Sequence, residues 1–274
     1  MKFIEKQGVK IPALGFGTWT LKGAGGQEMI KHALKTGYRH IDTAKAYGNE
    51  ADVGAAIKDA GCAREEVFVT TKIWHDRLAP ADFREDFKDS LKKLQVEFTD
   101  LLLIHWPSTT DVPLEDTLEE MMKIKSEGLT RLIGVSNFPS ELFRKASELT
   151  KGNIAVNQVE YHCFMDQSEV LEAVRENDAL LTAYSPVGKG KVFGHELIQK
   201  IGKKYDKNEG QVALRWLMQQ DNVAAIPRTS SKDHAESNFN IFDFELTADE
   251  MSDLNELQSK EGRLINPEFA PDWD

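Results

Sequence analysis

Residues 38–50 read YRHIDTAKAYGNE, and this stretch has the form of one βα unit. The apolar residues at its start are typical of a short strand, and Gly48 with Asn49 predicts an abrupt turn into a helix. Asp42 stands at the end of the expected strand, and Tyr47 lies in the loop that follows it. A carboxylate and a phenol placed there suggest two parts of a site whose partners lie elsewhere in the chain.

The same unit recurs along the rest of the chain. A small hairpin is expected first, over residues 2–12 around Gln7-Gly8. Short apolar runs then predict seven further strands, at 14–18, 67–73, 100–105, 131–136, 155–160, 180–185 and 223–227. Helical patterns lie among them, at 27–36, 80–94, 114–127, 139–149, 168–177 and 209–220, and two more follow at 233–239 and 247–257.

Eight βα units in 274 residues, with no linker rich in Pro, Gly or Ser, favour a closed (β/α)₈ TIM barrel that forms a single domain over residues 1–274. The competing architecture is a doubly wound open sheet, which carries G-x-G-x-x-G on its first βα turn. Here that turn reads GFGTWT (15–20) and has no third glycine. We expect the tail, which ends PEFAPDWD (267–274), to fold over the barrel mouth, because Phe269 and Trp273 are poorly suited to free solvent.

Composition narrows the possible partners. The chain has 34 Lys and Arg against 45 Asp and Glu, a formal net charge of −11, and no basic block. Such a protein should repel nucleic acid and anionic membranes. The two cysteines, Cys62 and Cys163, are far apart and predict neither a disulfide framework nor a metal cluster. No apolar run is long enough for a membrane span or a signal peptide, so we expect a cytoplasmic protein.

Chemistry in a barrel of this type sits where the strands end and the βα loops begin. Asp42, Lys72 and His105 end three successive expected strands, so they should converge on one mouth. Taken singly, each is an ordinary strand-end residue, but together they indicate a site. The polar and aromatic residues at the eight strand ends are Thr18, Trp19, Asp42, Tyr47, Lys72, Trp74, His105, Trp106, Ser136, Asn137, Asn157, Gln158, Glu160, Tyr184, Ser185, Arg228, Thr229 and Ser230.

These residue types suggest chemistry on a carbonyl group. Lys72 beside Asp42 would form an ion pair, and a cation near Tyr47 is expected to lower the pKa of its phenol from about 10, making it a general acid near neutral pH. A neutral His105 would donate a hydrogen bond to a carbonyl oxygen. No metal-ligand spacing and no Ser or Cys nucleophile beside a His appears, so a hydride or another nucleophile must come from a cofactor.

The motifs IDTAKAYGNE, TKIW, LLLIHWP, IGVSNF, NQVEYH, AYSPVGKG and IPRTS, in this order, resemble the aldo-keto reductases over essentially the whole chain. The short chain, HWPS, and the ending GRLINPEFAPDWD are most similar to the bacterial 2,5-diketo-D-gluconate reductase group, which also reduces methylglyoxal and other small ketones and aldehydes. The resemblance implies an NADPH-dependent enzyme that reduces small carbonyl compounds to alcohols, and a monomer.

It also implies roles for particular residues. Tyr47 would protonate the carbonyl oxygen, Lys72 and Asp42 would tune it, and His105 would orient the substrate. Ser136, Asn137 and Gln158 would bind the nicotinamide carboxamide, Tyr184 would stack on its ring, and residues 185–190 would wrap the pyrophosphate. The full cofactor set is Thr18, Trp19, Asp42, Ser136, Asn137, Gln158, Tyr184, Ser185, Pro186, Val187, Gly188, Gly190, Ile226, Pro227, Arg228, Thr229, Ser230, His234 and Asn238. The substrate set is Trp19, Tyr47, Trp74, His105, Trp106 and Trp273.

The strand-8 segment departs from the family pattern. Arg228 stands where the family commonly has Lys, Thr229 replaces Ser, and His234 replaces Arg, while Asn238 is kept. Arg228 keeps a cation that can grip a phosphate, but His234 removes a permanent charge from the adenosine end. We therefore expect NADPH with a weakened preference, and NADH use remains open. Two other readings also remain open, a non-catalytic cofactor-binding or regulatory member of the fold and a Schiff-base aldolase acting through Lys72.

Overall fold

Eight parallel strands form one sheet in the computed structural model, which describes residues 1–274. Each strand is hydrogen-bonded to the one before it in the chain, without a reversal of order. This sequential order differs from that of a doubly wound sheet, in which the order reverses at a switch point. The strands are β3 (Phe16–Gly17), β4 (His40–Asp42), β5 (Phe68–Ile73), β6 (Thr99–Ile104), β7 (Thr130–Ser136), β8 (Ile154–Glu160), β9 (Leu180–Tyr184) and β10 (Val223–Ala225).

The two edges of this sheet lie side by side. The Ala225 N–H donates to Ala13 O at 2.8 Å, and Gly15 N–H donates to Ala225 O at 2.8 Å. One step further on, Gly17 N–H donates to Pro227 O at 3.0 Å, and Leu14 forms a parallel bridge with Ala225. The sheet therefore curls until its first and last strands meet, and the carboxyl ends of all eight strands face the same way.

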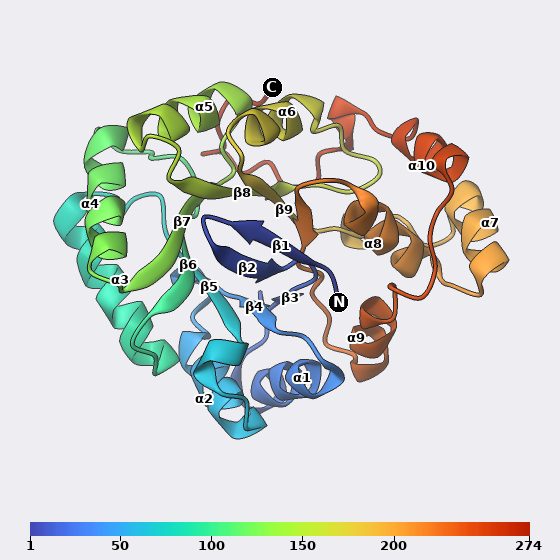
Figure 1. The fold of residues 1–274 in the computed structure, drawn as a ribbon, viewed down its shortest axis with the longest axis horizontal. Helices are drawn as coiled ribbons and strands as arrows, with labels where there is room; N and C mark the ends of the chain where they lie inside the picture. Colours follow the sequence, from blue (N-terminus) through green and yellow to red (C-terminus); the bar gives the residue numbers. More distant parts are fainter.

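Helices cover the outside of the ring of strands (Figure 1). Because they bury its outer face, most of the strands are buried along their whole length. All of the expected helices are present, and Pro80–Leu94 matches its prediction at both ends. The helices are α1 (Gly23–Thr36), α2 (Glu50–Ala60), α3 (Pro80–Leu94), α4 (Leu114–Ser126), α5 (Ser140–Leu149), α6 (Ser168–Glu176), α7 (Glu196–Tyr205), α8 (Glu209–Gln219), α9 (Lys232–Phe239) and α10 (Ala248–Asn255).

One helix, α7, was not anticipated. The expected pattern has a single helix between the strands at 180–185 and 223–227, whereas both α7 and α8 follow β9. Helix α7 buries only a narrow stripe, chiefly Ile198 and Ile201, and its other side carries a run of lysines. The segment is nevertheless strongly amphipathic, so the helical period was present in the sequence and α7 could have been predicted from it. Helix α2 was anticipated only as a helix start after Gly48-Asn49.

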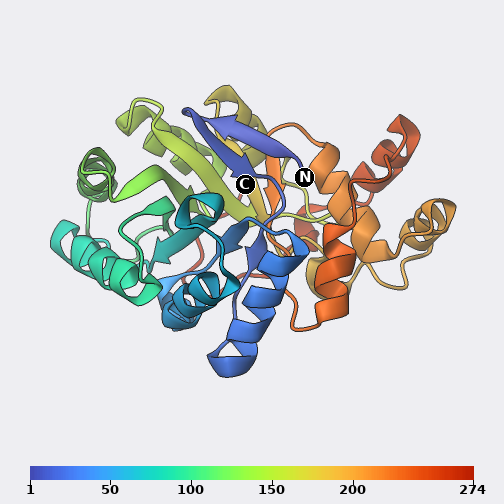
Figure 2. The ribbon, with the colours of Figure 1, turned by 60° about the horizontal axis from the view of Figure 1, so that its bottom comes forward.

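The predicted hairpin is confirmed, and it covers one end of the ring. Strands β1 (Phe3–Lys6) and β2 (Val9–Pro12) pair antiparallel, and Gln7 and Gly8 turn with positive φ of 50° and 76°. The hairpin lies across the centre of the ring in Figure 1 and stands at one end of it in Figure 2.

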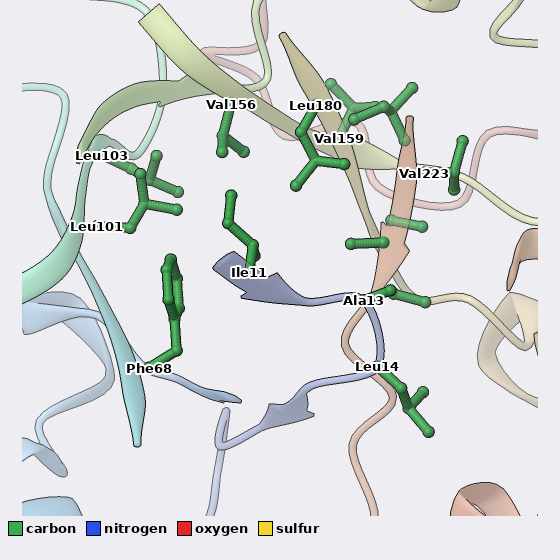
Figure 3. Packing of buried hydrophobic residues seen from close by; sticks show 14 of the residues in the cluster. Ile11, Ala13, Leu14, Phe68, Leu101, Leu103, Val156, Val159, Leu180 and Val223 are labelled. Atoms are coloured by element: carbon green, nitrogen blue, oxygen red, sulfur yellow. The ribbon is translucent and has the colours of Figure 1, made fainter. Parts of the chain in front are cut away.

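Ile11 from β2 points into the interior of the ring, towards Phe68, Leu101, Leu103 and Val156 (Figure 3), and is fully buried. Burial of such a side chain contributes about 1.5–3 kcal/mol. The hairpin therefore fills the amino end of the sheet with apolar side chains and leaves the carboxyl end for a site.

The segment after α10 returns to the ring and is held there by specific contacts. Ser259 pairs with Met165, and the Asp274 carboxylate accepts hydrogen bonds from the N–H and Oγ of Ser140 at the start of α5. Gly262 passes so close to the backbone of Phe164 that a Cβ at residue 262 would lie 1.7 Å from the Phe164 carbonyl oxygen. Met165, Phe164 and Ser140 all follow the carboxyl ends of β7 and β8, so the tail lies at the end of the sheet over which it was expected to fold. No helix has the length and apolar character needed to cross a membrane.

Candidate active site

A cavity of about 710 Å³ opens at the carboxyl ends of the strands. Its volume is in the range of small-molecule sites. Lys72 does not line it but lies fully buried behind Asp42. The predicted residues that do line it are Thr18, Trp19, Asp42, Tyr47, Trp74, His105, Trp106, Ser136, Asn137, Gln158, Tyr184, Ser185, Pro186, Val187, Ile226 and Arg228.

Asp42 and Lys72 form a buried ion pair. They come from the neighbouring strands β4 and β5, and only 0% of the Lys72 side chain and 2% of the Asp42 side chain are exposed. Lys72 Nζ donates to Asp42 Oδ1 at 2.5 Å and to Thr43 O at 2.8 Å, while Gln158 Nε2 donates to Asp42 Oδ2 at 2.8 Å. Burial lowers the pKa of Lys72, and the adjacent Asp42 carboxylate opposes that shift.

Tyr47 sits beside this pair, at the end of a short 3₁₀ helix, η1 (Lys45–Tyr47). Gly48 follows in a left-handed conformation, with φ of 63°, and turns the chain into α2. Lys72 Nζ lies 5.1 Å from the centre of the Tyr47 ring. The partly exposed ring faces the cavity that it lines, and protein surrounds its other sides.

The expected lowering of the Tyr47 pKa is wrong. Burial, followed by the Asp42 carboxylate, raises the pKa of the phenol well above its ordinary value. The reason is that Asp42 compensates the charge of Lys72 at 2.5 Å, so little of the cation's field remains to stabilise a phenolate. The phenol therefore keeps its proton throughout the neutral range and has one to donate.

His105 lies just beyond β6 and is buried as a neutral imidazole. Burial, with Lys72 and His75 adding to it, lowers the pKa of His105 well below its ordinary value. Its ring lies 5.6 Å from the Tyr47 ring and 4.9 Å from the Trp74 ring, both edge to face. Its Nδ1 is buried without a hydrogen-bond partner. The neutral state that the expected role of His105 requires agrees with this environment.

A network of neutral polar groups makes the opposite wall. Asn137, with a positive φ of 62°, donates from Nδ2 to His105 O at 2.9 Å and accepts from the Tyr184 hydroxyl at 2.8 Å. Ser136 Oγ donates to Gln158 O at 2.7 Å. The bonds of Asn137 fix its own amide and the Tyr184 ring, and the Gln158 side chain is held separately by Asp42.

Beyond Tyr184 the chain makes a tight turn with several left-handed residues. Ser185, Gly188, Lys189 and Gly190 have φ of 49°, 56°, 51° and 93°. Gly188 and Gly190 lie outside the cavity lining, whereas the exposed Lys189 lines it. The glycines thus serve the turn, and Lys189 supplies a positive charge at the rim.

Arg228 at the end of the last strand is engaged with the first loop. Its Nε donates to Trp19 O at 3.0 Å, and its Nη2 donates to Thr20 Oγ1. Other predicted cofactor residues of this region lie outside the cavity, and the exposed His234 is in the first turn of α9. This outer group comprises Pro227, Thr229, Ser230, His234 and Asn238.

The aromatic wall is partly as expected. Trp74 and Trp106 line the cavity, as does Trp19, although 58% of Trp19 is exposed. Trp273 does not line it, which corrects its predicted place. Its indole is held behind the wall, with the Arg263 guanidinium 3.6 Å from the ring centre and Nε1 donating to Asn266 Oδ1 at 2.8 Å.

Five tail residues line the cavity instead, and only Phe269 among them was considered from the sequence. The centre of its ring lies 4.2 Å from the ring centre of His75, 5.4 Å from that of Trp106 and 5.7 Å from that of Trp74. The apolar character of GRLINPEFAP was the available signal, but an irregular segment has no periodicity to show which side chains turn inward. The five are Leu264, Ile265, Asn266, Pro267 and Phe269, and Gly17 and Ala46 complete the unanticipated lining.

Comparison with known proteins agrees with this geometry. The family model described as the Aldo/keto reductase family matches residues 13–259. The chain belongs to the aldo-keto reductase family. It is therefore an oxidoreductase, and the family resemblance predicted from the sequence is confirmed.

The relatives of this aldo-keto reductase are similar over nearly their full length. The methylglyoxal reductase DkgB of Escherichia coli O157:H7 is 38% identical over 267 residues, covering 96% of this chain and 99% of that protein. An aldo-keto reductase of Mycolicibacterium vanbaalenii is 40% identical over 258 residues, covering 94% and 91%.

Solved structures give the same result. The crystal structure of a candidate 2,5-diketo-D-gluconic acid reductase B has a TM-score of 0.95 and 43% identity, covering 97% of this chain and 95% of that chain. The Bombyx mori aldo-keto reductase in complex with NADP has a TM-score of 0.90 and 31% identity, covering 99% and 97%. The curled sheet and the hairpin thus belong to a fold that this chain shares with solved aldo-keto reductases.

Proposed function

We propose that this aldo-keto reductase forms a single closed (β/α)₈ barrel domain and reduces small aldehydes and ketones with NADPH, Tyr47 being the proton donor. The observation that carries the proposal is that Tyr47, His105 and Asp42 line one cavity with Lys72 directly behind them. Methylglyoxal and 2,5-diketo-D-gluconate are the leading substrates, because relatives carry those names. We also propose a cytoplasmic monomer.

Each of the four residues has a distinct role in the proposed reaction. Tyr47 keeps its proton until a carbonyl oxygen approaches and then donates it. His105 is neutral and donates a hydrogen bond that orients the same oxygen. Lys72 and Asp42 hold each other behind the phenol and keep its surroundings fixed, so that Tyr47 retains its proton until the carbonyl oxygen is in place.

The residues around the cavity fit a nicotinamide cofactor. The cofactor supplies the hydride that the side chains lack. Tyr184, Asn137 and Ser136 form a fixed polar and aromatic wall suited to a flat amide-bearing ring. The left-handed turn at 188–190 places Lys189 at the rim of the cavity, and a positive charge there suits phosphate groups.

The geometry disfavours an aldolase that uses Lys72. A Schiff-base lysine needs its amine to reach the substrate. Here Lys72 Nζ is fully buried, does not line the cavity, and donates to both Asp42 and Thr43. The intact set of four residues likewise disfavours a purely regulatory cofactor-binding protein.

The test of the proposed function is the loss of absorbance at 340 nm when the protein is mixed with NADPH and a carbonyl compound. The panel is methylglyoxal, 2,5-diketo-D-gluconate, β-keto esters and aromatic aldehydes, with NADH run in parallel. Oxidation that requires both protein and carbonyl supports the proposal. Absence of oxidation across the panel with either cofactor contradicts it.

Arg228→Ala is expected to weaken the binding of NADPH more than the binding of NADH. If the guanidinium exchanges its bonds to Trp19 and Thr20 for the 2′-phosphate, its loss raises the KM for NADPH about tenfold and that for NADH less than about twofold. Steady-state kinetics with both cofactors measure this. Arg144→Ala, on the surface of α5, is the control. Equal effects on the two cofactors would show that Arg228 does not read the 2′-phosphate.

The rate of reduction is expected to be flat from about pH 6 to 9. Tyr47 must be protonated, and because its pKa is raised, the acid form is lost only at higher pH. His105 must be neutral, and because its pKa is lowered, it gains a proton only at lower pH. Single-turnover rates at saturating NADPH across this range provide the measurement. A steady fall between pH 7 and 9 would instead indicate a phenol with a lowered pKa.

A further inference from the structure

We propose that Glu160 is a positioning residue that holds the tail segment 264–269 over the cavity and so shapes the part of the site that receives the carbonyl substrate. Glu160 is the last residue of β8, and it does not line the cavity. The inference rests on the proposed function for its kinetic consequence, but the structural anchor can be measured without turnover.

The Glu160 carboxylate is the point where the tail is fixed to the strands. Glu160 is fully buried. Its Oε1 accepts the backbone N–H of Leu264 at 2.9 Å, and its Oε2 accepts the backbone N–H of Ile265 at 2.9 Å. Both carboxylate oxygens are therefore used by consecutive residues of the tail, and both of those residues line the cavity.

His162 supplies a third donor. Its Nδ1 accepts the N–H of Phe164 at 3.3 Å, so in the neutral ring the proton is on Nε2. That Nε2 lies 3.1 Å from Glu160 Oε1 and donates to it. Both side chains are fully buried, and the carboxylate has no Lys or Arg within salt-bridge distance. Three N–H donors thus stabilise the buried carboxylate, and two of these donors come from the tail.

The segment that Glu160 holds leads directly to the aromatic wall. Asn266 and Pro267 follow Ile265 along the cavity, and Phe269 then packs on Trp74, His75 and Trp106. The neighbouring Arg263 is fixed separately, on Trp273. Without its two backbone bonds to Glu160, the segment would lose the contact that sets its depth over the cavity, while the strand-end residues would stay in place.

The test compares Glu160→Gln and Glu160→Ala with the wild-type full chain. Gln keeps the shape but replaces one acceptor oxygen with an amide donor, so one tail N–H loses its acceptor, and Ala removes both acceptors. Glu169→Gln is the matched control, because it removes a carboxylate from an exposed pair with Lys260 in the same part of the tail.

Two readouts are needed. Hydrogen exchange of the Leu264 and Ile265 amides is expected to quicken about tenfold or more in both variants. The KM for methylglyoxal, or for the best carbonyl of the panel, is expected to rise about tenfold, with kcat and NADPH affinity changed less than about twofold. The control should show neither effect. A role limited to folding would lower thermal stability without moving the KM.

A second pairing keeps the test decisive if Glu160→Ala does not fold. Phe269→Ala leaves the strands intact and should itself raise the KM, so adding Glu160→Gln to it should raise the KM by a smaller factor than in the wild type. Unchanged amide exchange in the Glu160 variants, or fully additive effects on KM, would overturn the proposal. A wild-type protein that reduces no carbonyl would refute the proposed function instead, and the exchange measurement would still report on the anchor.

Discussion

Tyr47→Phe is expected to slow carbonyl reduction by about 10³-fold or more while leaving NADPH binding unchanged. The substitution removes only the hydroxyl, and no other protonated phenol is placed beside both Lys72 and His105. Because the pKa of Tyr47 is raised, the wild type carries the phenolic proton at neutral pH. The variant has no such proton to donate. Single-turnover rates at 340 nm and titration of NADPH binding measure the two effects.

The matched control for this experiment is Tyr205→Phe. It removes a hydroxyl that donates to Glu250 on the far side of the helical layer, away from the cavity. Its reduction rate should equal that of the wild type. If Tyr47→Phe also reduces carbonyls at a rate close to the wild type, Tyr47 is not the proton donor and the assignment of the site fails.

Lys72→Met is expected to lower the free energy of unfolding by about 3–5 kcal/mol, in addition to its effect on the reaction. Methionine has a similar length, so the loss is one of charge more than of packing. It leaves the buried Asp42 carboxylate with the Gln158 amide as its remaining side-chain donor. Urea denaturation followed by tryptophan fluorescence measures the change.

Two further variants separate the ion pair from other causes of that loss. Adding Asp42→Asn to Lys72→Met should restore most of the lost free energy of unfolding, because the uncompensated charge is then gone. Lys93→Met, which breaks an exposed pair with Asp89 on α3, should cost less than about 1 kcal/mol. A loss of that smaller size for Lys72→Met would contradict the buried-pair interpretation.

Strand-end positions explain why the centre of the site was predictable from the sequence. Asp42, Lys72 and His105 each follow or end a short apolar run, and parallel strands of one sheet place their carboxyl ends together. The hairpin turn at Gln7-Gly8 and the helix that begins at Pro80 were predictable for similar local reasons, because a turn pair and a proline at the first helical position act within a few residues.

What the sequence did not predict depends on contacts between distant segments. The pKa of Tyr47 is raised first by burial and then by the Asp42 carboxylate, which also compensates Lys72 at 2.5 Å, and neither effect follows from spacing along the chain. Trp273 and Phe269 are both aromatic residues of one irregular tail, yet only Phe269 reaches the cavity. Glu160 binds the backbone before Phe269, whereas Asn266 and Arg263 bind the Trp273 indole away from the cavity. No periodic pattern in the sequence predicts these contacts.

The reaction itself is tested most directly by tracing the hydrogen that reaches the carbonyl carbon. The wild-type protein is incubated with methylglyoxal and NADPH that carries deuterium at the transferable position of its nicotinamide, and the product is examined by mass spectrometry and NMR. If the chain reduces carbonyls by hydride transfer, the product is an alcohol with a single deuterium on the former carbonyl carbon, formed by the wild type and not by Tyr47→Phe. An alcohol without deuterium at that carbon, or equal product from both proteins, would contradict it.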